Sequence, residues 1–196
     1  MTAGAVLLAF VCWAFTFGMA WGNFWAKIGL SVIVICLYSL YWQKPQIRFR
    51  GPSVALGALS AAVLYGIFYL GYVLSPYVVP GATGQVGGIY AMGTNTDKAL
   101  IFLLLLFITG PGEEIFWRGF LQKNLMARYG NVGGFLLTTF IYGSVHIFSL
   151  NVMLIMAAYV AGAFWGALYL WRRDLALIIV SHSLWSAVIF AVFPVH

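Results

Sequence analysis

Residues 101–122 read IFLLLLFITGPGEEIFWRGFLQ, an apolar run that still carries three charged side chains. A helix that crosses a bilayer needs about 20 mostly apolar residues, and this run is long enough. The whole chain has the same character, because 63% of its 196 residues are hydrophobic and 7% are charged. An ordinary soluble domain carries roughly 25% charged residues. A chain this apolar cannot cover a surface that faces water, so we predict an integral membrane protein.

Apolar runs separated by charged residues, glycine and proline predict an all-α fold, a bundle of about seven transmembrane helices that forms a single domain over residues 1–196. The expected spans are residues 3–22, 25–42, 53–74, 98–126, 133–150, 152–170 and 175–193. The first run has no Lys or Arg ahead of it, so we expect a span there rather than a removable signal peptide. Residues 75–96 are rich in glycine and poor in charge, which suits a lid, a re-entrant segment or a plain linker. We prefer the linker.

Basic residues predict how the bundle lies in the membrane. Alternation of seven spans brings three basic clusters to one side: Lys44, Arg48 and Arg50, then Lys123 and Arg128, then Arg172 and Arg173. Cytoplasmic loops are enriched in Lys and Arg. We therefore expect a multi-pass protein of the cell membrane with its N-terminus in the cytoplasm and its C-terminus outside. The formal net charge of +6 comes from scattered residues rather than a basic stripe, so nucleic acid is not an expected partner.

Three charges lie inside the fourth predicted span: Glu113, Glu114 and Arg118. Each charge at the bilayer centre costs about 2.5–3.5 kcal/mol on insertion scales, so these side chains must face a polar cavity or one another. Helical spacing puts Glu114 and Arg118 on one face as neighbours four residues apart, whereas Glu113 points about 100° away. Glu113 is then left without a cationic partner, the situation of a carboxylate that can act as a general base. A purely structural ion-pair cluster is the alternative.

The stretch Thr109-Gly110-Pro111-Gly112 interrupts the apolar run just before the two acids. We expect the helix to break or kink there, and a broken backbone at membrane depth is tolerated where it lines a cavity. An ordinary proline kink is the alternative interpretation.

Two histidines lie in later predicted spans. His146 follows Tyr142 by one helical turn, and His182 precedes Ser186 by one turn. The rise of about 1.5 Å per helical residue allows both rings to reach the depth of Glu113, in the middle or the cytoplasmic half of the bilayer. Either histidine alone could equally be an interhelical hydrogen bonder. His196 is expected to be an uninvolved tail.

Other hydrolytic chemistries fit the sequence less well. The His-Glu-x-x-His spacing of zinc proteases is absent, and Arg118 already supplies positive charge beside the acids, so we expect no cofactor, with zinc as the lesser alternative. A Ser-His-Asp triad lacks its acid. Asp97 lies at a loop edge, and Asp174 stands beside Arg172 and Arg173.

The run Glu113-Glu114-Ile115-Phe116-Trp117-Arg118 resembles the Glu-Glu-x-x-x-Arg motif of the CPBP family of intramembrane proteases. That family contains the CAAX prenyl proteases of the Rce type and the bacterial Abi proteins linked to bacteriocin immunity. The resemblance extends over roughly residues 100–193, which would form the catalytic core. It implies that Glu113 and His146 activate water for attack on a peptide carbonyl, and that His182 stabilises the oxyanion.

Two positions depart from the family pattern, which has Phe four residues before the first His and Asn or Asp four after the second. Here these residues are Tyr142 and Ser186. Tyrosine keeps the aromatic wall and adds a hydroxyl group. Serine is a shorter donor than asparagine, which puts the strength of the oxyanion hole in question.

The function expected from these observations is an endopeptidase that cleaves membrane-associated or lipidated peptides at membrane depth, reached from the cytoplasmic side where the motif helix ends. Its expected partners are a peptide or lipidated protein substrate and the bilayer. The alternatives are a transporter or a bacteriocin-immunity or binding protein that uses the same polar cavity, and a metal-dependent hydrolase.

Overall fold

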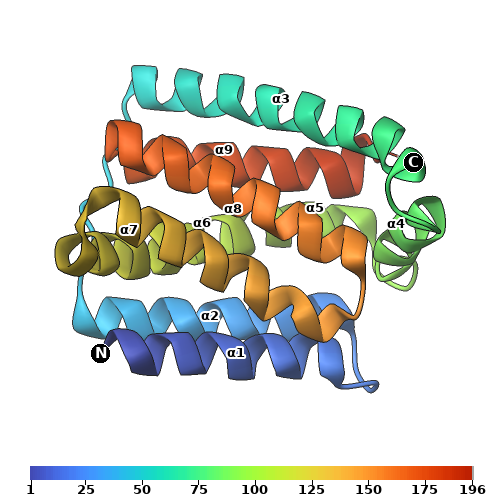
Figure 1. The fold of residues 1–196 in the computed structure, drawn as a ribbon, viewed down its shortest axis with the longest axis horizontal. Coiled ribbons are helices and arrows are strands. Elements are labelled where there is room, and N and C mark those ends of the chain that lie inside the picture. The colour runs from blue at the N-terminus through green and yellow to red at the C-terminus, as the bar shows by residue number, and fades with distance from the viewer. Residues whose placement is uncertain (196) are drawn as a thin grey trace.

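Helix accounts for nearly all of the computed structural model, which describes residues 1–195 and contains no strand within that range. The long helices lie side by side along one axis (Figure 1). In chain order the elements are α1 (Thr2–Gly18), α2 (Phe24–Trp42), α3 (Gly51–Leu74), η1 (Ser75–Tyr77), α4 (Ala82–Ala91), α5 (Lys98–Leu104), η2 (Leu105–Thr109), α6 (Gly110–Glu114), η3 (Ile115–Gln122), α7 (Lys123–Ser144), η4 (Val145–Ser149), α8 (Val152–Arg172), α9 (Leu175–Ala187) and η5 (Val188–Val192). The predicted all-α fold is confirmed, and His196 lies outside the described residues.

Five helical segments of the described chain are long and apolar enough to cross a membrane: Phe24–Trp42, Gly51–Tyr77, Lys98–Ser149, Val152–Arg172 and Leu175–Val192. The predicted count of seven is not confirmed by this measure. Helix α1 is apolar but shorter, with 17 residues. The segment Lys98–Ser149 runs for 52 residues and includes two of the predicted spans. A straight helix of that length would measure about 78 Å, far more than the roughly 30 Å hydrocarbon core.

The long segment reverses direction at Gly130. This residue has φ 77° and ψ 167°, a backbone conformation that glycine adopts without steric cost. After the reversal, the Cα of Gly134 packs directly against the backbone of Met126, where a side chain would not fit. The first turns of α7 therefore continue the motif helix, and the rest of α7 returns beside it (Figure 1).

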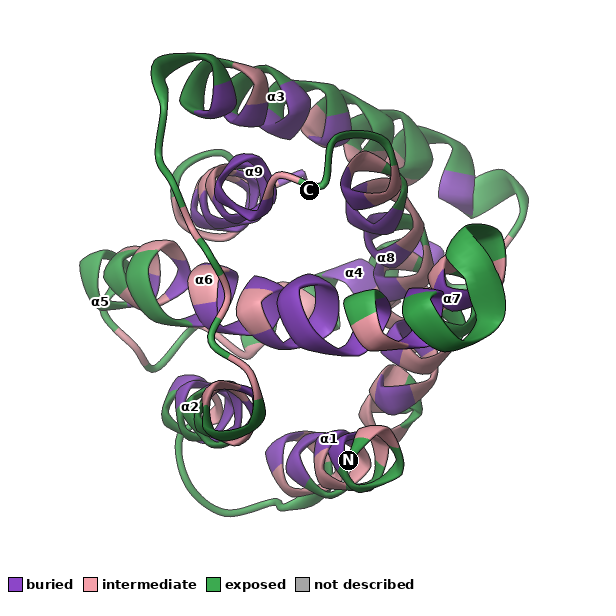
Figure 2. Cartoon of the chain, turned by 90° about the vertical axis from the view of Figure 1, so that its left-hand side faces the viewer, coloured by how far each residue is buried: buried purple, intermediate pink, exposed green. Residues whose placement is uncertain are grey.

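Helix pairs hold the bundle together: α1 packs on α2, α3 on α9, and α7 on α8. Helix α6 contacts both α2 and α9 and lies in the middle of the bundle when it is viewed along the helices (Figure 2). Glycines allow these close approaches, because a Cβ at Gly57 would lie 2.8 Å from the Leu177 carbonyl oxygen, and one at Gly162 would lie 2.8 Å from the Tyr142 ring. The central position of α6 buries its two glutamates.

The connections with basic residues gather at one end of the bundle, together with the N-terminus (Figure 1). Asn124, beyond the motif helix, donates a hydrogen bond to the Gln43 side chain in the α2–α3 connection, 3.0 Å away. Arg173, between α8 and α9, donates to Asn131 at the reversal of α7, 2.7 Å away. We call this end, which carries Lys44, Arg48, Arg50, Lys123, Arg128, Arg172 and Arg173, the basic end.

Residues 75–96 are not the plain linker that the sequence suggested. They form the turn η1 and helix α4 at the opposite end of the bundle (Figure 1). The Gln85 carbonyl oxygen accepts a hydrogen bond from Asn151 Nδ2 at 2.8 Å, and the Tyr90 hydroxyl donates to the Ile189 carbonyl oxygen at 3.2 Å. These bonds connect α4 to the residue that precedes α8 and to η5, which follows α9.

Candidate active site

The motif helix does not break where the sequence suggested. It widens instead, because Leu105–Thr109 and Ile115–Gln122 are π-helical and flank the short α6. The N–H of Gly110 bonds to the Leu105 carbonyl five residues back, and the next residue, Pro111, has no N–H to donate. Of the expected break or kink at Thr109–Gly112, the break is therefore not present, and the irregularity is a π-helical stretch. Both glutamates lie between two π-helical stretches, a feature that is frequent at functional sites.

Glu114 is the centre of a buried polar cluster. Its Oε1 accepts a hydrogen bond from Arg118 Nη1 at 2.8 Å and another from His182 Nδ1 at 2.6 Å. Arg118 Nη2 donates to the Gly162 carbonyl oxygen at 3.0 Å, and Glu114 and Arg118 are both fully buried. The structure thus contains the Glu114–Arg118 pair that helical spacing predicted. It adds His182 as a second partner, which the sequence did not indicate.

Glu113 differs from its neighbour in its surroundings. Its side chain lines the main cavity, and its Oε2 is buried without a hydrogen-bond partner among residues 1–195. The Tyr142 hydroxyl lies near enough to act as a hydrogen-bond donor to this carboxyl group. The Tyr142 ring also carries the Arg118 guanidinium over its face, 4.9 Å from the ring centroid. A carboxylate on a cavity wall can accept a proton from a bound water.

His182 is held rigidly on two sides. Its ring stacks on Trp165 with the ring centroids 3.8 Å apart and the planes inclined by 16°. Because Nδ1 is bonded to Glu114, Nε2 is the nitrogen left for a ligand in the cavity, which His182 also lines. A proton on this Nε2 could be donated to a bound carbonyl oxygen.

Ser186 shares that wall, but its hydroxyl is already engaged. Its Oγ donates to the His182 carbonyl oxygen one turn back, at 2.6 Å. A serine in a helix commonly makes this bond. The Ser186 proton is therefore directed at the backbone rather than into the cavity, although Ser186 does line it.

His146 has a partner at each ring nitrogen. Nδ1 donates to the Tyr142 carbonyl oxygen at 2.8 Å, so Nε2 is the acceptor for Trp13 Nε1–H, 3.1 Å away. Trp13, on α1, is almost completely buried. Sequence reasoning missed Trp13, and the only available signal was the general need of a buried indole N–H for an acceptor. In this arrangement the His146 lone pair is not available to water.

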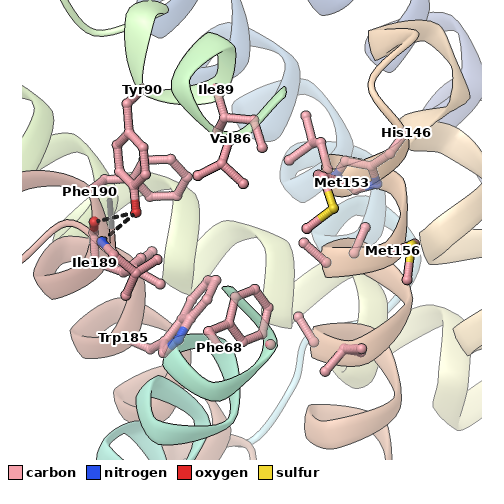
Figure 3. A pocket seen from close by; sticks show the side chains of 18 of the residues that line it. Phe68, Val86, Ile89, Tyr90, His146, Met153, Met156, Trp185, Ile189 and Phe190 are labelled. Atoms are coloured by element: carbon pink, nitrogen blue, oxygen red, sulfur yellow. Dashed lines mark hydrogen bonds between the residues drawn. The ribbon is translucent and has the colours of Figure 1, made fainter. Parts of the chain in front are cut away.

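These side chains surround a cavity of about 450 Å³ whose walls are otherwise mostly apolar. Glu113, Tyr142, His146, His182 and Ser186 all line it. Aromatic and aliphatic side chains, including Phe68, Val86, Ile89, Trp185 and Phe190, form much of the remaining wall (Figure 3). Arg118 and Glu114 lie behind the wall rather than on it.

The cavity extends towards the end of the bundle where the motif helix begins. Its lining includes Phe24 and Trp25 at the start of α2, Leu74 at the end of α3, and Ile89 on α4. The start of α2, the end of α3 and helix α4 lie at the end of the bundle opposite the basic end (Figure 1). We expected the site to be reached where the motif helix ends, and the cavity lining lies instead towards the start of that helix.

The polar cluster does not match a zinc site. No three His, Cys, Asp or Glu side chains of residues 1–195 converge on a point where a metal ion could bind. Arg118 and His182 both donate to the same oxygen of Glu114, and both nitrogens of His146 are bonded elsewhere. A metal would have to displace these partners to gain three protein ligands.

Residues 95–188 match the family model of the type II CAAX prenyl endopeptidases, Rce1-like. This segment, just under half of the chain, is similar to the Rce1-like family. The Rce1-like segment runs from just before α5 to the end of α9 and contains Glu113, Glu114, Arg118, His146, His182 and Ser186. It does not include Trp13 or α4. Comparison with curated proteins and with solved structures found no match.

The match confirms the resemblance to the CPBP family that the Glu-Glu-x-x-x-Arg run suggested. Together with the apolar helices, it indicates a multi-pass membrane protein of a peptidase family. It does not favour the transporter or the immunity and binding alternatives.

Proposed function

We propose that the protein is an intramembrane endopeptidase that hydrolyses peptide bonds of membrane-associated or lipidated peptides. The observation that carries this proposal is the unequal environment of the two glutamates. Glu114 Oε1 is bonded to Arg118 and His182, and this side chain does not line the cavity. Glu113 has no ion-pair partner among residues 1–195 and lines the mostly apolar cavity, although Oε2 of each carboxyl group lacks a hydrogen-bond partner. Such a division supports a structural role for one acid and a chemical role for the other.

In the proposed reaction, Glu113 accepts a proton from a water molecule while the water oxygen attacks the peptide carbonyl carbon. The carbonyl oxygen becomes an oxyanion. His182, when Nε2 is protonated, donates a hydrogen bond to that oxygen, and Glu114 supports the resulting charge on the ring through Nδ1. The C–N bond then breaks, and Glu113 returns its proton to the leaving amine.

His146 is proposed to orient the attacking water together with Glu113, since both side chains line the same cavity. Its Nε2 must first part from Trp13 Nε1–H, because a single lone pair cannot accept both donors. We propose that no metal takes part, and that Glu113 and His146 alone activate the water.

The mostly apolar walls of the cavity favour a substrate with an apolar group. A peptide with a large apolar side chain or a lipid group next to the scissile bond would bury that group against the aromatic and aliphatic lining. Burial of apolar surface contributes about 25 cal/mol per Å².

Purified wild type and Glu113→Gln, each in lipid nanodiscs, test the proposal on a library of apolar and prenylated peptides analysed by mass spectrometry. Cleavage products should appear with the wild type and not with the variant. Ser149→Ala, at a residue that does not line the cavity, is the matched control and should cleave as the wild type does. Equal product yields from wild type and Glu113→Gln would refute the assignment of Glu113.

A further inference from the structure

The basic end and the cavity lie at opposite ends of the bundle. Of the ten Lys and Arg residues in the chain, seven belong to the basic end. They sit in the α2–α3 connection, at the reversal of α7 and in the α8–α9 turn, all of which lie at the same end (Figure 1). Short connections rich in Lys and Arg stay in the cytoplasm during membrane insertion.

The cavity end carries much less charge. Lys27, near the start of α2, donates its Nζ proton to the Met19 carbonyl oxygen at 2.5 Å and is mostly buried. Asp97 caps the N-terminus of α5 through the Ala99 and Leu100 N–H groups. Lys98 is the remaining charged residue at this end among residues 1–195. The charge asymmetry therefore places the cavity end away from the cytoplasm.

The cavity also reaches the side of the bundle. Lining residues on both α3 and α8 keep large exposed fractions, 41% for Ile67, 45% for Met156 and 43% for Val160. Val78, just beyond η1, is 75% exposed and lines the cavity as well. The apolar lining is thus continuous with the surface that would face lipid between α3 and α8.

We infer that the site is reached from the non-cytoplasmic half of the membrane, and that it takes peptides whose apolar or lipid-bearing part lies in the outer leaflet. The cleavage of such peptides rests on the proposed function, whereas the side from which the cavity is reached does not. A substrate that slides between α3 and α8 keeps its apolar group in lipid until it meets the apolar wall. Among residues 1–195, Glu113 is the one Asp, Glu, Lys or Arg whose side chain lines the cavity, so selection by head-group charge is not expected.

Cysteine labelling determines on which side of the membrane the cavity opens, and it does not depend on catalytic turnover. In a Cys12→Ala, Cys36→Ala background, Val78→Cys reports the cavity mouth and Arg50→Cys the basic end; both positions are exposed. A membrane-impermeant maleimide added to intact cells should label Val78→Cys, and it should label Arg50→Cys only after the membrane is permeabilised. The opposite pattern, or protection of both positions in intact cells, would overturn the inference.

Membrane vesicles of known orientation test from which side the substrate is cleaved. A lipidated, membrane-impermeant peptide added from outside should be cleaved by right-side-out vesicles and at least tenfold more slowly by inverted ones. Cleavage confined to inverted vesicles would overturn the inference. If neither preparation cleaves while Val78→Cys is labelled from outside, the proposed function fails and the assigned side of the cavity stands.

Discussion

Replacement of Glu114 by Gln should destabilise the protein far more than replacement of Glu113. Glutamine keeps the shape of the side chain, and its carbonyl oxygen can still accept one hydrogen bond. It removes the negative charge, however, and leaves the guanidinium of Arg118 fully buried without a counter-charge. Removal of one partner of a buried ion pair costs about 3–5 kcal/mol.

The magnitude is large compared with the total stability of a domain, about 5–15 kcal/mol. At about 1.4 kcal/mol per tenfold, it corresponds to roughly two to four orders of magnitude in the folding equilibrium. The second hydrogen bond to the same oxygen, from His182, adds to the loss for Glu114→Gln. Glu113 is next to Glu114 in the sequence but makes no ion pair among residues 1–195. We therefore expect Glu113→Gln to change the free energy of unfolding by about 1 kcal/mol or less.

Unfolding in mixed micelles, followed by tryptophan fluorescence during titration with a denaturing detergent, measures both variants against the wild type. Monodisperse yield on size-exclusion chromatography gives a second measure. Glu114→Gln should unfold at a markedly lower detergent fraction, and Glu113→Gln should nearly coincide with the wild type. Equal stability of the two variants, or a Glu114→Gln protein that is stable yet inactive, would refute the division of roles between the glutamates.

Other variants test single contacts. Glu113→Gln should lower kcat by about 10²–10⁴, the range for loss of a general base, and a variant that turns over normally would contradict the mechanism. His182→Ala should lower kcat by about 10²–10³ if the ring is an oxyanion donor, and a smaller loss than that of Ser186→Ala would contradict it. Ser186→Ala should stay within tenfold of the wild type, because its hydroxyl donates to a backbone carbonyl, whereas Ser186→Asn should lower folded yield; a poorly active Ala variant would return Ser186 to the site. Trp13→Phe keeps a ring in place and frees His146 Nε2, so kcat should rise several-fold, and a tenfold fall would show that Trp13 positions the imidazole for catalysis. Turnover should survive EDTA and phenanthroline, and a loss that zinc reverses would support the metal alternative.

Local spacing predicted some of the site, and long-range contacts supplied the rest. The Glu114–Arg118 pair follows from residues four apart on one helix, so the sequence contains all the information that is needed. The bond between Trp13 and His146 joins residues 133 positions apart, and no pattern in either helix indicates it. The shared depth of Glu113, His146 and His182 was predicted as possible, and the structure brings all three to one cavity.

The fold, too, was predicted in part from local sequence and differed where long-range contacts decide. Apolar periodicity predicted the helices, and the position of Gly130 between two predicted spans is where the chain reverses. The two differences have specific causes. A break or kink was expected at Thr109–Gly112, but the helix continues there, because a π-helical stretch just before Pro111 accommodates its missing N–H. Residues 75–96 were expected to be a linker because glycine disfavours helix, and contacts of Gln85 and Tyr90 with later helices stabilise α4 nonetheless.

A single carboxylate oxygen, Glu114 Oε1, holds both Arg118 on its own helix and His182, which lies 68 positions later. During biosynthesis the ribosome releases the motif helix well before α9. Until α9 inserts, the nascent chain has the acids, the arginine and His146, but Glu114 lacks its second partner, His182. The docking of α9 therefore both completes the helix bundle and supplies the second partner of Glu114, so under the proposed mechanism the oxyanion donor arrives only when folding ends.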